Sequence, residues 1–174
     1  MADLFNISFN LVFFAKILGF VAFLVTCYGY TRVEDNQLRL AVAISSAILS
    51  IHFMMLGAWV AALSLFINAI RNNVSRYRTG FKWFLGFAII QIIVSYYFYQ
   101  SGKDLFPIIG SLISGYAVFC ASKLFLRSLM LVCTLLWLVN NVLLMSYGAI
   151  MLDILGIIMN IYGMRKILLE QQSK

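Results

Sequence analysis

The chain has 174 residues, of which 63% are hydrophobic and 11% are charged, and its mean hydropathy is +0.96. A soluble fold of this length has too little interior to bury so much apolar surface, so the composition excludes a soluble globular protein and indicates a membrane protein. The formal net charge is +7, but the basic residues flank apolar runs and form no groove with interleaved aromatics, which argues against a nucleic-acid partner.

Seven apolar stretches follow one another along the chain, each close to the ~20 residues that cross a hydrocarbon core of ~30 Å. They predict an all-α fold with transmembrane helices at about 11–31, 38–56, 58–74, 82–100, 105–122, 128–146 and 149–168. Two boundaries fall within nearly uncharged sequence and each needs a turn. We expect one turn at Gly57 and the other at "SYG", residues 146–148. The whole of 1–174 is expected to form one integral membrane domain.

The N-terminal segment does not resemble a cleavable signal. The first fifteen residues contain Asp3 and no Lys or Arg, and no small-residue cleavage site follows the first apolar run. We therefore expect the first helix to be retained.

The basic residues are distributed unevenly between the two sides that seven crossings define. One side carries Lys103, together with Lys16 if that side chain snorkels outward. Eleven basic residues are expected on the other side: Arg32, Arg39, Arg71, Arg76, Arg78, Lys82, Lys123, Arg127, Arg165, Lys166 and Lys174. By the positive-inside rule, the N-terminus is expected outside and the C-terminus in the cytoplasm.

An internal repeat relates the first three helices to the last three. Gly19 matches Gly110 at an offset of 91, and the following hairpins match at an offset of 89. The polar and turn positions that coincide at 89 are Ser45 with Thr134, His52 with Asn141, Gly57 with Ser146, and Ser64 with Asp153.

Two three-helix units run in the same direction only if another helix separates them. Repeat one is expected at about 11–75, the linker helix at 82–100 and repeat two at 105–169. This 3+1+3 plan of parallel repeats is the one found in SWEET transporters, whose solute site lies near the midplane between the repeats.

The sole histidine, His52, and its counterpart Asn141 are the first candidates for such a site. Polar groups in hydrocarbon are costly unless satisfied, so both are expected to face the interior or a wet cavity. One interpretation is a solute-binding pair with Trp137 as a stacking surface. The other is that both side chains satisfy nearby groups and hold helices together. The predicted substrate-binding set is Ser45, His52, Thr134, Trp137, Asn140 and Asn141.

A second set of polar residues is expected to couple transport to protons or to line the cavity: Ser64, Asn68 and Asp153. Asp153 is the one acid well inside a predicted span, where it is either a protonation switch or an acid favoured by a helix N-terminus. Arg71 continues the stripe of Ser64 and Asn68 but is interpreted as a cytoplasmic anchor. Gln91 is expected to pack against neighbouring helices.

The three cysteines, Cys27, Cys120 and Cys133, lie in apolar helices and have no CxxC spacing. They predict neither a disulfide nor a metal site, and no cofactor motif is present.

Several motifs carry a family resemblance over nearly the whole chain. "IHFMMLGAW" followed by "INAIRN", then "LFPIIGSLISGYAVF" and "WLVNN", resemble the YgjV-type family of bacterial inner membrane proteins. This resemblance implies a location in the bacterial cytoplasmic membrane. More distantly, the plan is similar to SWEET, PQ-loop and PnuC-type transporters, although this chain has no Pro-Gln motif and its sole proline is Pro107. Family members often have a histidine where this chain has Asn140, a departure that argues against a proton relay there.

Three functional classes follow. The favoured one is a facilitator or secondary transporter of a small polar solute, embedded in membrane lipid. The alternative is a structural or assembly protein without transport, and a homo-oligomer is compatible with either. An enzyme is disfavoured, because the chain has one histidine, no HExxH, no GxSxG and no paired acids.

Overall fold

The computed structural model describes residues 2–30 and 35–172, and it is all-helical over these ranges. The elements are α1 (Ala2–Tyr30), α2 (Asp35–Met55), α3 (Trp59–Val74), α4 (Phe81–Phe98), a 3-10 turn η1 (Gly102–Asp104), α5 (Leu105–Cys120), α6 (Lys123–Leu143) and α7 (Tyr147–Gln172). Arg32 and Lys174, which the topology prediction uses, lie outside the described residues, as does the side chain of Arg39.

All seven predicted helices are present, and the molecule is apolar on its outside. Five helical segments are long and apolar enough to cross a membrane: Leu11–Tyr28, Phe81–Phe98, Gly102–Cys120, Lys123–Leu143 and Tyr147–Leu169. The apolar part of α2, Leu40–Met55, is shorter, and α3 has 16 residues. Each of the seven helices exposes large apolar side chains, as expected of a surface that contacts lipid. These features confirm a multi-pass helical membrane protein.

The turn between α2 and α3 forms where it was predicted, and the turn between α6 and α7 does not. Gly57 has φ +73 and so uses the left-handed conformation that glycine tolerates best. In the second hairpin, Met145 has φ +50, and Gly148 lies inside α7. The prediction of a turn at 146–148 was therefore wrong by about two residues.

The two turns have the same backbone hydrogen bonds, but at an offset of 88 instead of 89. Leu56 N donates to His52 O, and Leu144 N donates to Asn140 O. The bond from Ala58 to Phe53 likewise corresponds to the bond from Ser146 to Asn141. In these hairpins His52 thus corresponds to Asn140, and its sequence pairing with Asn141 was wrong by one residue.

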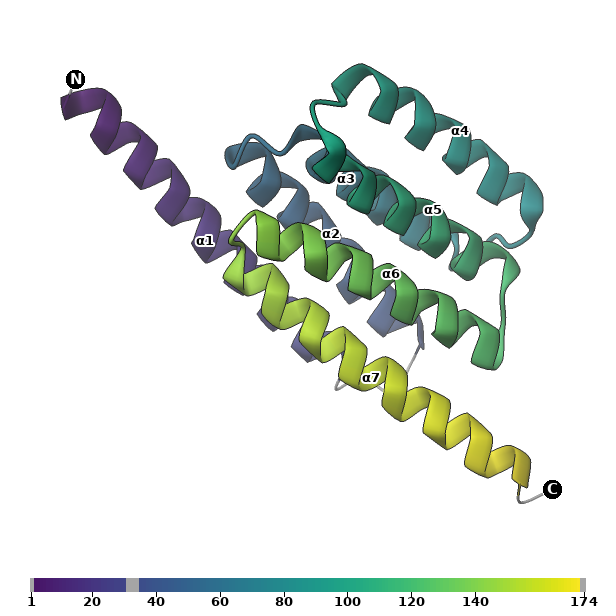
Figure 1. Ribbon diagram of the computed structural model, residues 1–174. Coiled ribbons are helices and arrows are strands. Elements are labelled where there is room, and N and C mark those ends of the chain that lie inside the picture. The colour runs from purple at the N-terminus through teal and green to yellow at the C-terminus, as the bar shows by residue number, and fades with distance from the viewer. Residues whose placement is uncertain (1, 31–34, 173–174) are drawn as a thin grey trace.

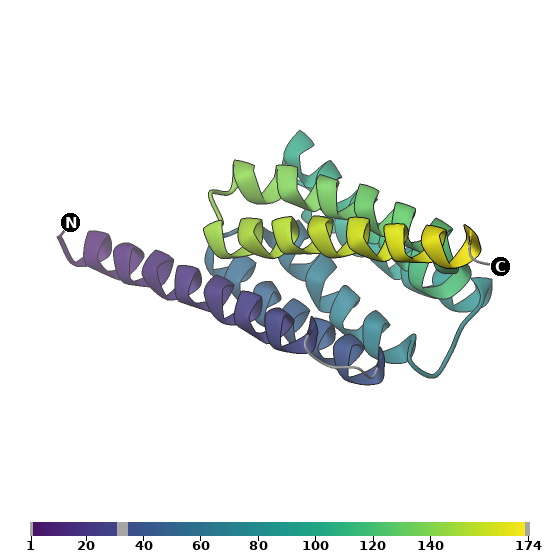
Figure 2. The same ribbon diagram turned by 90° about the horizontal axis from the view of Figure 1, so that it is seen from below.

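Contacts between neighbouring helices arrange six of them in a ring. Its order is α1, α2, α3, α5, α6 and α7, and contacts between α1 and α7 close it. Helix α4 packs outside the ring, against α3 and α5. The N-terminal part of α1 extends beyond the other helices in both views (Figures 1 and 2).

The contact between α1 and α7 depends on two glycines. A Cβ added at Gly148 would overlap the backbone of Gly19, so these helices approach more closely than larger residues allow. Glycine at such crossings is typical of helix packing in membranes. Gly148 therefore serves helix packing and not the turn.

Candidate functional site

A cavity of about 180 Å³ lies inside the ring and is lined by residues from all six of its helices. Each ring helix contributes at least one polar residue, for example Thr26, Ser45, Asn68, Ser114, Asn141 and Asp153. No residue of α4 lines it within the described chain. At about 30 Å³ per molecule, this space would hold on the order of six waters or a small solute.

Asn141 and Asp153 form the strongest polar contact on the cavity wall. Asn141 Nδ2 donates to Asp153 Oδ2 at 2.6 Å, joining α6 to α7. Both side chains are buried, and a carboxylate in a membrane interior needs such donors. Asn140, the neighbouring predicted residue, is buried but does not line the cavity. Its Nδ2 makes only a long contact of 3.4 Å to Asn141 Oδ1.

His52 does not line the cavity and does not converge with Asn141 on one pocket. Its ring is 1% exposed, with Nδ1 at 2.5 Å from Ala15 O and Nε2 at 2.7 Å from Ser146 Oγ. A carbonyl only accepts, so Nδ1 carries the proton and Nε2 accepts from the Ser146 hydroxyl. The histidine joins α2 to α1 and to the start of α7. This contact fits the interpretation in which His52 satisfies nearby groups and holds helices together.

The one-residue change in register explains where His52 points. Successive residues of a helix are rotated by about 100° around its axis. Because Phe53 faces the cavity, the preceding residue His52 faces α1 and α7 instead. Phe53, near the C-terminal end of α2, lines the cavity.

Three other predicted contact residues do line the cavity: Ser45, Thr134 and Trp137. The two hydroxyls are already bonded to backbone, Ser45 Oγ to Ala22 O at 2.9 Å and Thr134 Oγ1 to Met130 O at 2.8 Å. The Trp137 indole lies against Gly110, where a Cβ would come within 3.0 Å of Nε1. These residues shape the wall more than they offer free hydrogen-bonding groups.

Of the residues predicted on α3, Asn68 lines the cavity and Ser64 does not. Gln91 Nε2 of α4 donates to Ser64 Oγ at 2.7 Å, so Ser64 faces α4 and not the cavity. Gln91 thus packs against a neighbouring helix, as predicted. Asn68 Nδ2 donates to Ser111 Oγ at 3.2 Å, whereas Asn68 Oδ1 is buried without a partner.

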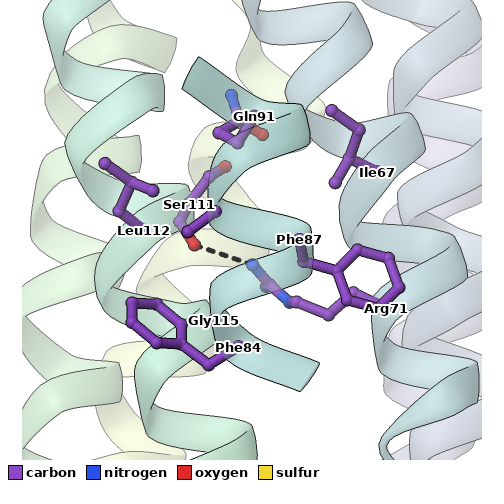
Figure 3. A pocket seen from close by; sticks show the side chains of 9 residues that line it. Ile67, Arg71, Phe84, Phe87, Gln91, Ser111, Leu112 and Gly115 are labelled. Carbon is purple, nitrogen blue, oxygen red and sulfur yellow. Dashed lines mark hydrogen bonds between the residues drawn. The ribbon is translucent and has the colours of Figure 1, made fainter. Parts of the chain in front are cut away.

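Arg71 is the residue that sequence reasoning misjudged most. It is 4% exposed and lines the cavity, so its interpretation as a cytoplasmic surface anchor was wrong. Nη1 donates to Ser111 O at 2.7 Å and Nη2 to Ser114 Oγ at 2.8 Å, and Figure 3 shows the first of these bonds. Nε has no partner. The stripe at Ser64, Asn68 and Arg71 was the available signal, but the position near the end of α3 favoured a surface residue.

Gly115 makes room for the guanidinium group. A Cβ at this position would lie 3.1 Å from Arg71 Nη1. The hydrogen bonds of Nη1 and Nη2 go to neutral acceptors of α5, and no carboxylate among the described residues pairs with Arg71. The cavity wall therefore holds a buried cation without a counter-ion.

The described residues contain no cluster of three or more His, Cys, Asp or Glu side chains suited to a metal ion. Cys27, Cys120 and Cys133 are free thiols, and Cys133 lines the cavity.

Comparison with known proteins identifies the family. The family model Imp-YgjV, described as a bacterial inner membrane protein, matches residues 13–171. The chain is 27% identical to the inner membrane protein YgjV of Escherichia coli (strain K12) over 147 residues, or 84% of this chain and 80% of that relative. No solved structure matches the chain. The resemblance found in the sequence is confirmed, and the chain belongs to the Imp-YgjV family of multi-pass bacterial inner membrane proteins.

Proposed function

We propose that this protein is a facilitator or secondary transporter of a small polar solute, which binds in the cavity inside the six-helix ring. The observation that carries the proposal is the cavity itself: a space of about 180 Å³ with a buried Arg and a buried Asp on its wall. Polar groups without partners in a membrane interior raise the free energy of the folded protein. They are typically found where they bind or conduct a solute or ion.

The order of helices in the ring supports two parallel repeats. If α1, α2 and α3 are replaced by α5, α6 and α7, and the reverse, each contact in the ring falls on another contact of the ring. The contact between α3 and α5 then corresponds to the contact between α7 and α1. The hairpin turns also match at one constant offset of 88. A cavity enclosed by two such units is what the 3+1+3 plan expects.

Asn141, Asp153, Asn68 and Trp137 are the proposed solute contacts, together with Arg71. Asp153 is also the proposed residue for coupling to protons. Ser45 and Thr134 contribute only to the surface of the cavity wall. The proposed site does not include three residues that do not line the cavity: His52, Asn140 and Ser64. The N-terminus is proposed to lie outside, because the exposed Lys103 and the basic loops occupy opposite ends of the helices.

A structural or assembly role is the second candidate, and the helix-joining hydrogen bonds favour it. His52, Ser45 and Gln91 all connect different helices. If no water or solute enters the cavity, these hydrogen bonds between helices alone would explain why the chain has buried polar residues.

The native thiol of Cys133 tests whether water and solutes enter. In a Cys27→Ser/Cys120→Ser background, a small membrane-impermeant thiosulfonate reagent is applied to right-side-out cells and to inverted vesicles. We expect Cys133 to react from both sides, because a transporter exposes its cavity alternately. Val132→Cys, with Cys133→Ser added, is the matched control: residue 132 is 47% exposed on the lipid face and should not react. Protection of Cys133 from both sides would contradict transport and favour the structural role.

A further inference from the structure

We infer that the cavity selects a small zwitterion, whose carboxylate binds Arg71 and whose ammonium group binds Asp153. This inference rests on the proposed function, and it names the class of solute.

The guanidinium of Arg71 has an unused donor that a carboxylate would satisfy. Two of its nitrogens are bonded to Ser111 O and Ser114 Oγ, while Nε is buried and unpartnered. Arg presents its N–H groups in a planar fork that matches a carboxylate better than a neutral acceptor. Binding a carboxylate would therefore supply both the missing hydrogen bond and the missing negative charge.

Asp153 offers the complementary charge from the opposite wall. Its helix α7 lies opposite α3 in the ring order. Among the described residues Asn141 donates to its carboxylate at Oδ2, so Oδ1 is available to an ammonium group. No basic side chain of the described chain pairs with this carboxylate.

The partners of the guanidinium on α5 and the residue Asp153 on α7 occupy similar positions along their helices. The guanidinium is held at Ser111 and Ser114, six and nine residues into α5, and Asp153 is six residues into α7. Both helices begin at the same end of the ring, and at ~1.5 Å per residue these positions are roughly 9 to 13 Å from that end. We therefore expect one small molecule in the cavity to reach both groups.

The charged residues of the wall favour a solute that carries both signs of charge. Arg71 and Asp153 are the two charged residues that line the cavity within the described chain. A simple anion would meet the Asp153 carboxylate, and a neutral polyol would leave both charges without a counter-ion, which is costly in a membrane interior.

Four probes with one carbon skeleton test this selection: L-serine, glycerate, serinol and glycerol. They carry both charges, the negative charge alone, the positive charge alone and no charge. Binding is measured by thermal stabilisation of the purified protein, and uptake is measured in proteoliposomes. We expect L-serine to bind about tenfold or more tightly than the other three, because each charged hydrogen bond lost costs at least that factor.

Two variants assign the ends of the solute. Arg71→Gln should remove the preference for L-serine over serinol, and Asp153→Asn should remove the preference for L-serine over glycerate. Gly115→Ala, which crowds Arg71 without removing its charge, should weaken L-serine binding if Arg71→Gln does not fold. Lys103→Gln, at an exposed residue outside the cavity, should leave all four affinities unchanged.

The outcomes separate this inference from the proposed function. Tighter binding of glycerate, serinol or glycerol would overturn the zwitterion and leave solute transport intact. Failure of all four probes to bind, with Cys133 reactive from both sides, would also overturn the zwitterion alone. Failure of all four with Cys133 protected would overturn both.

Discussion

The imidazole of His52 and the hydroxyl of Ser146 lie 2.7 Å apart, although 94 residues separate them in the chain. Through this bond the end of α2 is held to the start of α7, and through Ala15 O it is held to α1. The two proposed repeats are therefore joined by a side chain that does not touch the cavity.

Replacing this histidine should reduce stability. His52→Ala leaves a void in a fully buried position and leaves the Ser146 hydroxyl without its acceptor, so we expect a loss of about 2 to 4 kcal/mol in the free energy of unfolding. Thermal unfolding in detergent measures it. Ile51→Ala, at the adjacent residue, 53% exposed, is the control and should change little. A His52→Ala protein as stable as this control, but unable to bind solute, would return His52 to the binding site.

Closing the ring between α1 and α7 should depend on the absence of a side chain at Gly148. Gly148→Ala places a methyl group against the backbone of Gly19, so we expect the helices to separate at a cost of about 1 to 3 kcal/mol or more. Gly86→Ala is the matched control, because a Cβ there meets no atom within 4 Å and alanine favours a helix by ~1 kcal/mol. Size-exclusion profiles and unfolding curves compare Gly148→Ala with Gly86→Ala. Equal stability of these variants would show that α1 and α7 do not touch at Gly148.

The bond between Asn141 and Asp153 should give a measurable coupling energy. Asn141→Ala leaves the carboxylate without its donor, whereas Asn141→Ala/Asp153→Ala removes both partners. A double-mutant cycle on the free energy of unfolding should yield about 1.5 to 3 kcal/mol, the range for a hydrogen bond to a charged group. Additive effects would mean that the 2.6 Å contact contributes nothing. If the cavity binds solute, Asn141→Ala should also impair uptake.

The proposed orientation predicts opposite labelling of two exposed basic positions. In a background without native cysteines, Lys103→Cys should react with an impermeant thiol reagent added outside intact cells, and Arg78→Cys should react only in inverted vesicles. The converse pattern would reverse the orientation.

The sequence predicted the helices well, because apolar runs of the right length can form little else in a bilayer. It predicted a turn at Gly57 because the nearly uncharged stretch is too long for one span and glycine favours turns, and the positive φ of Gly57 agrees with this. The same reasoning failed at Gly148, since a glycine serves close packing as readily as a turn and a single sequence does not distinguish the two. Met145 accepted the left-handed conformation instead.

The cavity was harder to predict than the fold. Apolar helices align almost equally well in neighbouring registers, and a shift of one residue rotates a side chain by about 100°. That shift was sufficient to place His52 against α1 and α7 while Asn141, Trp137 and Asp153 stayed on the cavity wall. Arg71 was misjudged because its neighbours on α5, above all Gly115, become visible only when the helices are packed.

Helix α4 has a consequence beyond reversing the direction of the chain. Phe84 and Phe87 of this helix lie beside Arg71 where its guanidinium bonds α5 (Figure 3). The helix thereby insulates a positive charge from the acyl chains, whereas the seam between α1 and α7 is closed by the approach of Gly148 to Gly19. The one helix outside the ring thus stands where the ring carries a buried cation.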